Sequence, residues 1–248
     1  MIKDLEFILK KIFFSQKYLL EKRLKRAIKK NYEKELEIID RYSDQSKDAL
    51  DIGVYRGVYS FQLAKYFKFV HSFEPNPLLF PYLDKNLKRI LNNIQLYNYA
   101  LSDSNGDTKL KLPKRSTSFF KNNIEELYKL GAASIHPKNK FDNFKEVIVK
   151  KKKLDNFKIS NKIGFIKIDV EGHEIEVING AKEMITNNKP VLLVEIEERH
   201  TKSSVLESIN YINKFGYNCF YVNDKKLISI DRLKSTKLEN NYYFIPNI

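Results

Sequence analysis

Residues 49–67, with the sequence ALDIGVYRGVYSFQLAKYF, set the fold class of this chain. They open with a short apolar run, typical of a buried strand, that ends at Gly53. Apolar side chains then recur every three residues from Val58 to Phe67, which predicts a helix with one buried face. A buried strand, a glycine turn and an amphipathic helix in this order are typical of the first unit of a parallel α/β sheet.

The same alternation of strand and helix continues to the end of the chain. Further strands are predicted at residues 69–77, 94–102, 163–169, 190–197, 217–222 and 241–246. Helices are predicted up to about residue 91 and at residues 174–185 and 202–215. The pattern predicts a Rossmann-like α/β fold, which is a mostly parallel sheet with helices on both faces. Ligands of such sheets bind beyond the carboxyl ends of the strands.

About 60 residues separate the third predicted strand from the fourth, far more than the dozen that a crossover needs. Residues 106–113 alternate like an edge strand after the turn signal Asn105-Gly106, and residues 146–157 supply a partner strand. A long insertion at the ligand-binding edge is more often the wall of a substrate site than decoration. We therefore expect residues 104–160 to form one wall of that site.

The chain has 45 Lys and Arg against 31 acidic residues, a net charge of +14. Residues 17–30 hold seven Lys/Arg against one Glu, and residues 138–153 hold seven Lys against two acids. This favours an anionic partner such as nucleic acid, an acidic glycan or a membrane surface. Abundant Lys, Asn and Ile throughout the chain are equally typical of AT-rich coding, so the sequence leaves both explanations open.

The N-terminal residues 2–30 have apolar side chains near helical spacing with Lys and Arg between them. A basic amphipathic helix of this kind either covers a domain core, which is more common, or lies on an anionic membrane. We expect a helical extension over residues 1–45 and one larger domain over residues 46–248. No apolar stretch approaches 20 residues, no signal peptide is visible, and Cys219 is the single cysteine. A cytoplasmic protein is expected, with peripheral contact at the inner membrane face as an alternative.

The glycine turn does not suit a dinucleotide. Such a ligand needs a second glycine where this chain has Tyr55, because its pyrophosphate lies against the backbone. Gly53 and Gly57 suit a ligand without phosphates. Glu74 follows 21 residues after Gly53, where an acid can accept hydrogen bonds from ribose hydroxyls. Ribose without pyrophosphate points to S-adenosylmethionine (SAM).

Five segments resemble the FkbM-type family of SAM-dependent methyltransferases. They are LDIGVYRGVYS (50–60), FEPNP (73–77), NYALSD (98–103), IGFIKIDVEGHEIEVINGAKEMI (163–185) and KPVLLVEI (189–196). The resemblance covers roughly residues 49–246. It implies a seven-stranded class I methyltransferase fold whose last strand is antiparallel. It also implies SAM as the cofactor and O-methylation of a sugar in a glycan, glycolipid, nucleotide-sugar or natural product.

The resemblance assigns roles to individual residues. It places methionine at the glycine turn, ribose at Glu74, and the transferring methyl group next to Asp169. The residues implied in cofactor binding are Asp51, Gly53, Gly57, Tyr59, Ser60, Glu74, Pro75, Asn76, Ala100, Leu101 and Asp169.

A sugar hydroxyl is a poor nucleophile, so a base near it would accelerate transfer by about 10²–10⁴-fold. The candidate catalytic residues are Asp169, Glu171, His173 and Glu195. Histidine titrates near neutral pH and suits this task, although His173 could equally be a solvated residue in the first turn of a helix. Asp169 with Glu195 could also hold a divalent cation, but no His or Cys spacing indicates zinc and no metal site is assigned.

Two other functions stay open. An RNA methyltransferase would explain the positive charge, but the chain lacks an RNA-binding module and an Asn-Pro-Pro-Tyr-like motif, so nucleic acid is not the expected partner. A non-catalytic binding or membrane-associated protein would have no reason to keep Gly53, Glu74 and Asp169 together. The acceptor could be anionic if the lysines at 150–153 recognise it, and the oligomeric state does not follow from the sequence.

Overall fold

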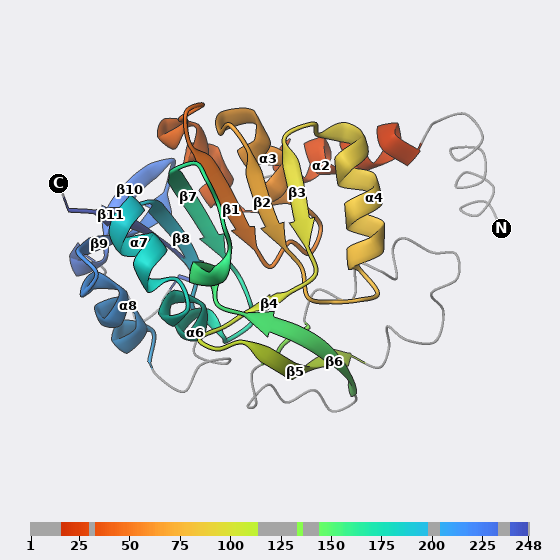
Figure 1. The fold of residues 1–248 in the computed structure, drawn as a ribbon. Coiled ribbons are helices and arrows are strands. Elements are labelled where there is room, and N and C mark those ends of the chain that lie inside the picture. Colours follow the sequence, from red (N-terminus) through yellow and green to blue (C-terminus); the bar gives the residue numbers. More distant parts are fainter. Residues whose placement is uncertain are drawn as a thin grey trace.

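The computed structural model describes residues 16–29, 33–113, 133–135, 144–197, 204–232 and 239–247. Its main element is an eight-stranded sheet of order β10-β9-β11-β8-β7-β1-β2-β3 (Figure 1). The strands are β1 (Asp48–Ile52), β2 (Val70–Phe73), β3 (Ile94–Tyr97), β7 (Ile163–Ile168), β8 (Val191–Glu195), β9 (Tyr217–Asn223), β10 (Lys226–Ser229) and β11 (Asn241–Pro246). Strands β3, β2, β1, β7 and β8 are parallel, and β11 is antiparallel to both neighbours. The predicted fold class is confirmed.

The sheet has eight strands where seven were expected, because β10 forms an antiparallel hairpin with β9. The chain turns at Asp224 and Lys225, which have positive φ angles of 47° and 61°. Two-residue hairpin turns of this kind are usually recognised by Asn-Gly or Asp-Gly. Lys225 stands in place of the glycine, so no turn signal marked this hairpin.

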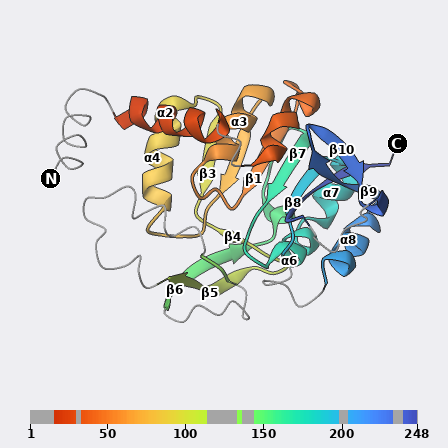
Figure 2. The ribbon, with the colours of Figure 1, turned by 180° about the vertical axis from the view of Figure 1, so that it is seen from behind.

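Helices cover both faces of the sheet (Figures 1 and 2). One face shares its apolar core with α2 (Gln16–Lys29), the 3₁₀ helix η1 (Lys34–Tyr42), α3 (Val58–Tyr66) and α4 (Phe80–Ile90). The other face packs against α6 (Glu174–Asn179), α7 (Lys182–Asn188) and α8 (Val205–Asn213). Two short 3₁₀ turns, η4 (Leu154–Asn156) and η5 (Ile230–Arg232), complete the helical elements of the described residues.

The helix predicted over residues 174–185 is two short helices that meet at Gly180. The Asp155 carboxylate accepts hydrogen bonds from two backbone N–H groups in the first turn of α7, so that helix starts anew there. A Cβ atom on Gly180 would lie 2.0 Å from the carbonyl oxygen of Ser102. Glycine therefore lets the chain at Ser102 approach the junction of α6 and α7.

The strand predicted over residues 94–102 is divided between two sheets. After β3 the chain enters β4 (Ala100–Leu101). This strand belongs to a second sheet of order β4-β6-β5, in which β5 is Gly106–Pro113 and β6 is Phe144–Lys152. The division falls at Asn98, whose side-chain amide donates to the carbonyl oxygens of Glu74 and Pro75. These bonds draw the chain across the end of β2, which periodicity alone could not predict.

The two strands predicted inside the insertion pair as expected. β5 (Gly106–Pro113) and β6 (Phe144–Lys152) are antiparallel along their whole length. Figure 1 shows the small sheet lying across the carboxyl ends of the main strands. The insertion thus occupies the edge where a ligand-site wall was expected, and its residues 114–132 and 136–143 lie outside the described residues.

The N-terminal helix α2 packs against α3 and α4 on one face of the molecule (Figure 2). Leu20 and Leu24 are each only 2% exposed, so the apolar side of α2 covers the core as expected. Residues 2–15 and residue 30 of the helix predicted over residues 2–30 lie outside the described residues. Within the described part of the chain, no helix combines the length and apolar character that crossing a bilayer requires.

Candidate active site

A cavity of about 550 Å³ opens between the small sheet and the carboxyl ends of the main strands. Eight of the predicted site residues line it: Gly53, Glu74, Pro75, Ala100, Leu101, Asp169, Glu171 and Glu195. Its other lining residues are Glu33, Ile52, Tyr55, Arg56, Phe73, Leu79, Tyr99, Leu110, Ala133, Ile135 and Val170. Motifs separated by more than 100 residues in the sequence therefore meet in one cavity.

The glycine turn is held against the end of β7. Gly53 has a φ of 88°, and a Cβ atom there would lie only 1.7 Å from the carbonyl oxygen of Asp169. The N–H of Asp169 donates to the carbonyl oxygen of Ile52 at 2.9 Å. Any side chain at Gly53 would push these two strand ends apart, so glycine places Asp169 directly beside the turn.

Glu74 is buried at the end of β2 and faces the cavity. Its two carboxylate oxygens accept backbone hydrogen bonds from Tyr55 (3.1 Å) and Asn76 (2.9 Å). These bonds fix the carboxylate, and each oxygen keeps a lone pair for a further donor. Burial raises the pKa of Glu74 to about 7. The position and remaining acceptor capacity suit a ligand that presents two hydroxyl groups.

The remaining predicted cofactor residues do not line the main cavity: Asp51, Gly57, Tyr59, Ser60 and Asn76. The Asp51 carboxylate accepts a 2.5 Å hydrogen bond from the Ser60 hydroxyl, which lies 2.8 Å from that of Ser72. This buried network joins β1, β2 and α3, and burial raises the pKa of Asp51 to about 7. Asp51 and Ser60 thus stabilise the glycine turn through buried hydrogen bonds and do not line the cavity.

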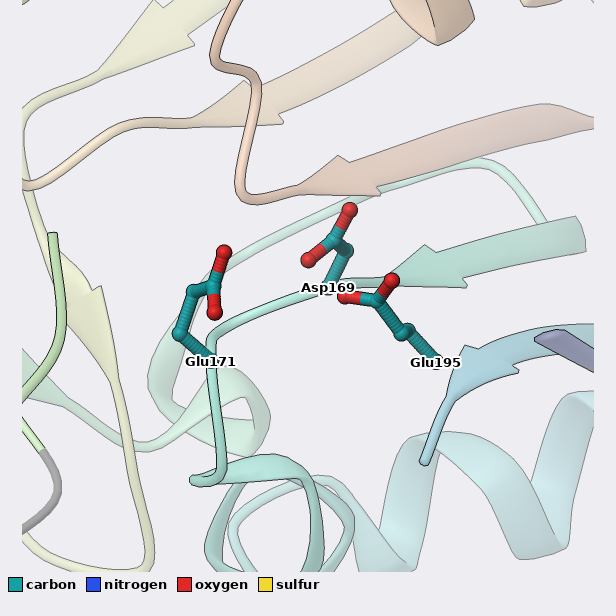
Figure 3. Close-up of side chains that lie close together, drawn as sticks. All are labelled: Asp169, Glu171 and Glu195. Carbon is teal, nitrogen blue, oxygen red and sulfur yellow. The ribbon is translucent and has the colours of Figure 1, made fainter. Parts of the chain in front are cut away.

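Three carboxyl groups gather in the same cavity. One oxygen from each of Asp169, Glu171 and Glu195 lies within 4.8 Å of the others. Figure 3 shows Asp169 and Glu195 side by side at the ends of neighbouring strands, with Glu171 on the loop after β7. Burial, and then the adjacent Asp169 carboxylate, raise the pKa of Glu195. The cluster can accept hydrogen bonds from a polyhydroxylated ligand and take up a proton.

The sequence profile of the methyltransferase FkbM domain matches residues 51–219, which is more than half of the chain. The chain belongs to the FkbM methyltransferase family. The matched range contains the glycine turn, Glu74 and the three carboxylates, so every part of the cavity described above except Glu33 falls within it.

A solved structure shows the same fold, and a second one is similar at a lower score. A methyltransferase FkbM from Methylobacillus flagellatus KT superposes with a TM-score of 0.51 at 18% identity, covering 81% of this chain and 44% of that chain. An rRNA methylase from Streptococcus thermophilus has a TM-score of 0.46 at 11% identity, covering 85% of this chain and 91% of that chain. The fold is that of class I SAM-dependent methyltransferases. This chain spans less than half the length of the first structure, and a search of curated proteins found no match.

Beneath the three carboxylates lies Lys167, a residue that no motif indicated. It is 1% exposed, and its ammonium lies 3.5 Å from the Asp169 carboxylate and 5.1 Å above the ring of Tyr59. Burial alone would lower the pKa of Lys167, but the carboxylates of Asp169 and Glu195 outweigh it and raise the pKa. A lysine inside the otherwise apolar strand IGFIKI was the signal that could have revealed it.

The three carboxylates also have the ligand type that a hard divalent cation prefers, as expected for Asp169 and Glu195. Lys167, however, already supplies a positive charge at this position. Proton uptake by Glu195 reduces the negative charge further. No cation enters the mechanism proposed below.

His173 does not line the cavity, although it was a candidate base. Its Nε2 lies 2.9 Å from the hydroxyl of Ser102, which joins the start of α6 to the end of β4. The neighbouring Glu174 is buried, and its carboxylate accepts hydrogen bonds from the N–H groups of Val170 and Gly172. Both side chains shape the turn that presents Asp169 and Glu171, and neither reaches the cavity.

The described residues of the insertion contribute Leu110, Ala133 and Ile135 to the cavity wall, and η1 is preceded by the lining residue Glu33. Tyr99 and Arg56 add an aromatic ring and a guanidinium group. Arg56 and Tyr99 lie inside the segments LDIGVYRGVYS and NYALSD but received no role there, and the other four lie outside the family segments, where their place depends on how the small sheet and the N-terminal segment fold over the cavity. Sequence reasoning had no signal for them.

Proposed function

We propose that this chain is a SAM-dependent O-methyltransferase that methylates a hydroxyl group of a sugar. The observation that carries the proposal is the single cavity that joins the glycine turn and Glu74 to the carboxyl groups of Asp169, Glu171 and Glu195. One end suits a nucleoside and the other suits a polyol. Membership of the FkbM methyltransferase family supports this division of the cavity.

In this proposal SAM occupies the end of the cavity near β1 and β2. Its ribose hydroxyls donate to Glu74, and its adenine lies among the apolar side chains of Leu101, Phe73 and Leu79. Its methionine part crosses the glycine turn at Gly53, where no side chain blocks the backbone. This arrangement brings the sulfonium group toward Asp169, whose negative charge complements the positive sulfur.

Methyl transfer is then an in-line displacement. The acceptor oxygen forms a bond to the methyl carbon while the carbon–sulfur bond breaks, and the bonding electrons stay on sulfur, giving S-adenosylhomocysteine (SAH). The hydroxyl proton passes to the carboxylate of Asp169, which Lys167 stabilises in its charged form. Positioning of the two reactants supplies most of the rate, because effective molarities of oriented groups reach about 10⁵–10⁸ M.

The acceptor end of the cavity is acidic, which favours a sugar that is uncharged near the reacting hydroxyl. Glu33, Glu171 and Glu195 line this end with Asp169, and Arg56 is the cation among the described lining residues. The lysines at 150–153, which suggested an anionic acceptor, do not line the cavity: Lys150 pairs with Asp107 at 2.7 Å. A carboxylate or phosphate close to Glu171 would be repelled.

The test combines binding and turnover. Calorimetry with SAM and SAH should show binding of both, and radiolabelled SAM should transfer methyl groups to methyl glycosides with free hydroxyls. We expect uncharged glycosides to react with a kcat/KM at least about tenfold higher than the matching uronates, the effect of one like charge in the cavity. Failure to bind SAM would refute the cofactor assignment. Faster reaction of uronates, or transfer to RNA in place of sugars, would refute the acceptor assignment.

A further inference from the structure

The positive charge of the chain is concentrated on the N-terminal helix α2. Its 14 residues hold six Lys/Arg and one Glu, whereas the whole chain of 248 residues has a net charge of +14. The single acid, Glu21, already pairs with Lys25 at 2.7 Å. An AT-rich composition would spread lysine over the whole chain, so it does not account for a net charge of +5 on one short helix.

The charges on α2 form one exposed stripe. Tyr18, Lys22, Lys25 and Lys29 are spaced three or four residues apart, so they lie along one side of the helix, with Arg26 beside them. All five residues are exposed, and Tyr18 is 44% exposed. We call these five residues the α2 stripe.

The opposite side of α2 is fixed to the protein, through Leu20 and Leu24, against α3 and α4 (Figure 2). The stripe is therefore presented on a rigid rod of about 21 Å, the length of a 14-residue helix. Lys65 on α3 is a further positive charge near the stripe. Burial, and then the nearby charge of Lys25, lower the pKa of Lys65. The protein thus holds several like charges close together on its surface, and Glu21 is the one acid of α2.

We infer that the α2 stripe docks this protein on an anionic lipid bilayer. A bilayer is a flat anionic surface that can contact the whole helix at once and needs no groove in the protein. Tyr18 lies at one end of the stripe with Lys22 5.7 Å above its ring, and tyrosine is favoured at the membrane interface. Nucleic-acid sites favour arginine forks and several stacked aromatic rings, whereas the stripe offers three lysines, one arginine and one ring.

The test is flotation of the full chain with vesicles of phosphatidylcholine alone or mixed with phosphatidylglycerol. The test variant carries four substitutions on the stripe: Lys22→Glu, Lys25→Glu, Arg26→Glu and Lys29→Glu. The control variant carries four at other exposed sites, with the same change in net charge: Lys158→Glu, Lys162→Glu, Lys182→Glu and Lys226→Glu. Circular dichroism establishes that both variants fold, and Lys→Gln and Arg→Gln versions of the stripe variant replace it if the Glu version does not fold.

We expect the wild-type and control proteins to float with anionic vesicles and to dissociate at about 1 M salt, where charges are screened beyond about 3 Å. The fraction of the stripe variant that binds anionic vesicles should be at least about tenfold lower than that of the wild type. Equal binding by the stripe variant, or an equal loss in the control, would overturn the proposal. Absence of wild-type binding would do the same. Tighter binding of duplex RNA or DNA than of anionic vesicles, abolished by the stripe substitutions, would assign the stripe to nucleic acid. None of these outcomes depends on methyl transfer.

Discussion

Among the individual residues, Lys167 is a buried ammonium group whose charge balances that of neighbouring carboxylates. An ammonium that is 1% exposed loses its hydration, and several contacts offset that loss. Its Nζ lies 3.5 Å from Asp169, 3.3 Å from the side-chain oxygen of Asn241 and 5.1 Å above the ring of Tyr59. One buried lysine thereby ties together β7, β11 and α3 beneath the carboxylates.

Replacing Lys167 by methionine should destabilise the protein and make its stability more dependent on pH. The substitution leaves Asp169 and Glu195 without their positive neighbour. Breaking a buried ion pair costs about 3–5 kcal/mol, and we expect the lower end because Asp169 is 35% exposed. The loss should grow as pH rises and the carboxyl groups ionise. Urea unfolding at several pH values measures it, with Lys182→Met at an exposed site as the control. A variant as stable as wild type would show that the charge is dispensable.

The buried carboxylate of Glu74 should make SAM binding dependent on pH. Burial raises the pKa of Glu74 to about 7, and ribose hydroxyls need its unprotonated oxygens as acceptors. Affinity for SAM should therefore fall as pH drops below about 7. Glu74→Gln should weaken SAM binding by at least about tenfold, since hydrogen bonds to a charged group contribute about 1.5–3 kcal/mol each.

Calorimetry at a series of pH values separates these effects for Glu74. The wild-type protein should show the decline in affinity at low pH, and the Glu74→Gln variant should show little of it. Ser104→Ala, at the start of the insertion and outside the cavity lining, is the control and should bind SAM like the wild type. Equal affinity of the Gln variant and the wild type at pH 8 would refute the ribose assignment.

At the scale of elements, the turn between β1 and α3 depends on one glycine. Gly53→Ala should destabilise the protein by about 3 kcal/mol or more, because the new Cβ would lie 1.7 Å from the Asp169 carbonyl oxygen and φ is 88°. Gly106→Ala is the matched control. Its φ is also positive, at 135°, but no atom lies within 4 Å of its added Cβ. Thermal unfolding of both variants separates the effect of atomic overlap at the new Cβ from that of backbone strain. Equal losses of stability in the two variants would show that the close approach of Gly53 to Asp169 does not matter.

The regular elements could be predicted where local periodicity decides them. The strand and helix on either side of Gly53 and the β5–β6 pairing follow from residue spacing alone. The interruptions of the predicted strand 94–102 and of the predicted helix 174–185 could not be predicted, because tertiary contacts cause them. Asn98 draws the chain out of the main sheet, and Asp155 starts α7 as a new helix. The same holds for the site, where Glu74 ends a strand of recognisable pattern but Leu110 reaches the cavity through the folding of the insertion.

For the whole molecule, the two kinds of charge lie on different parts of the surface. The α2 stripe is positive and lies on the exposed side of a helix that packs against α3 and α4, whereas the carboxyl groups of the cavity lie at the carboxyl ends of the strands. The net charge of the chain therefore says little about the acceptor. An acidic cavity selects its ligand at short range, while the basic helix acts over about 8 Å, the screening length at physiological salt.

The stability of the ligand-free protein should fall as pH rises from about 4.5 to about 7. Burial raises the pKa of Asp51, Glu74 and Glu174 to about 7 each, so the folded state holds protons that the unfolded state releases at lower pH. The stabilisation is fully present below the unfolded pKa and is lost as pH rises through the folded pKa. Each group contributes at most about 3–4 kcal/mol, since one pKa unit corresponds to about 1.4 kcal/mol.

Glu174→Gln isolates one of these contributions. A single oxygen of Glu174 accepts both backbone bonds, from Val170 and Gly172, and the amide oxygen of glutamine can accept them equally well. The variant should match the wild type near pH 5, where Glu174 is protonated, and exceed it above pH 7, where the wild type holds an ionised buried carboxylate. Urea unfolding across this range measures the difference, with Glu183→Gln at an exposed site as control. Parallel pH profiles for Glu174→Gln and wild type would show that ionisation of Glu174 is not coupled to folding, and that its carboxylate serves the turn only as a hydrogen-bond acceptor.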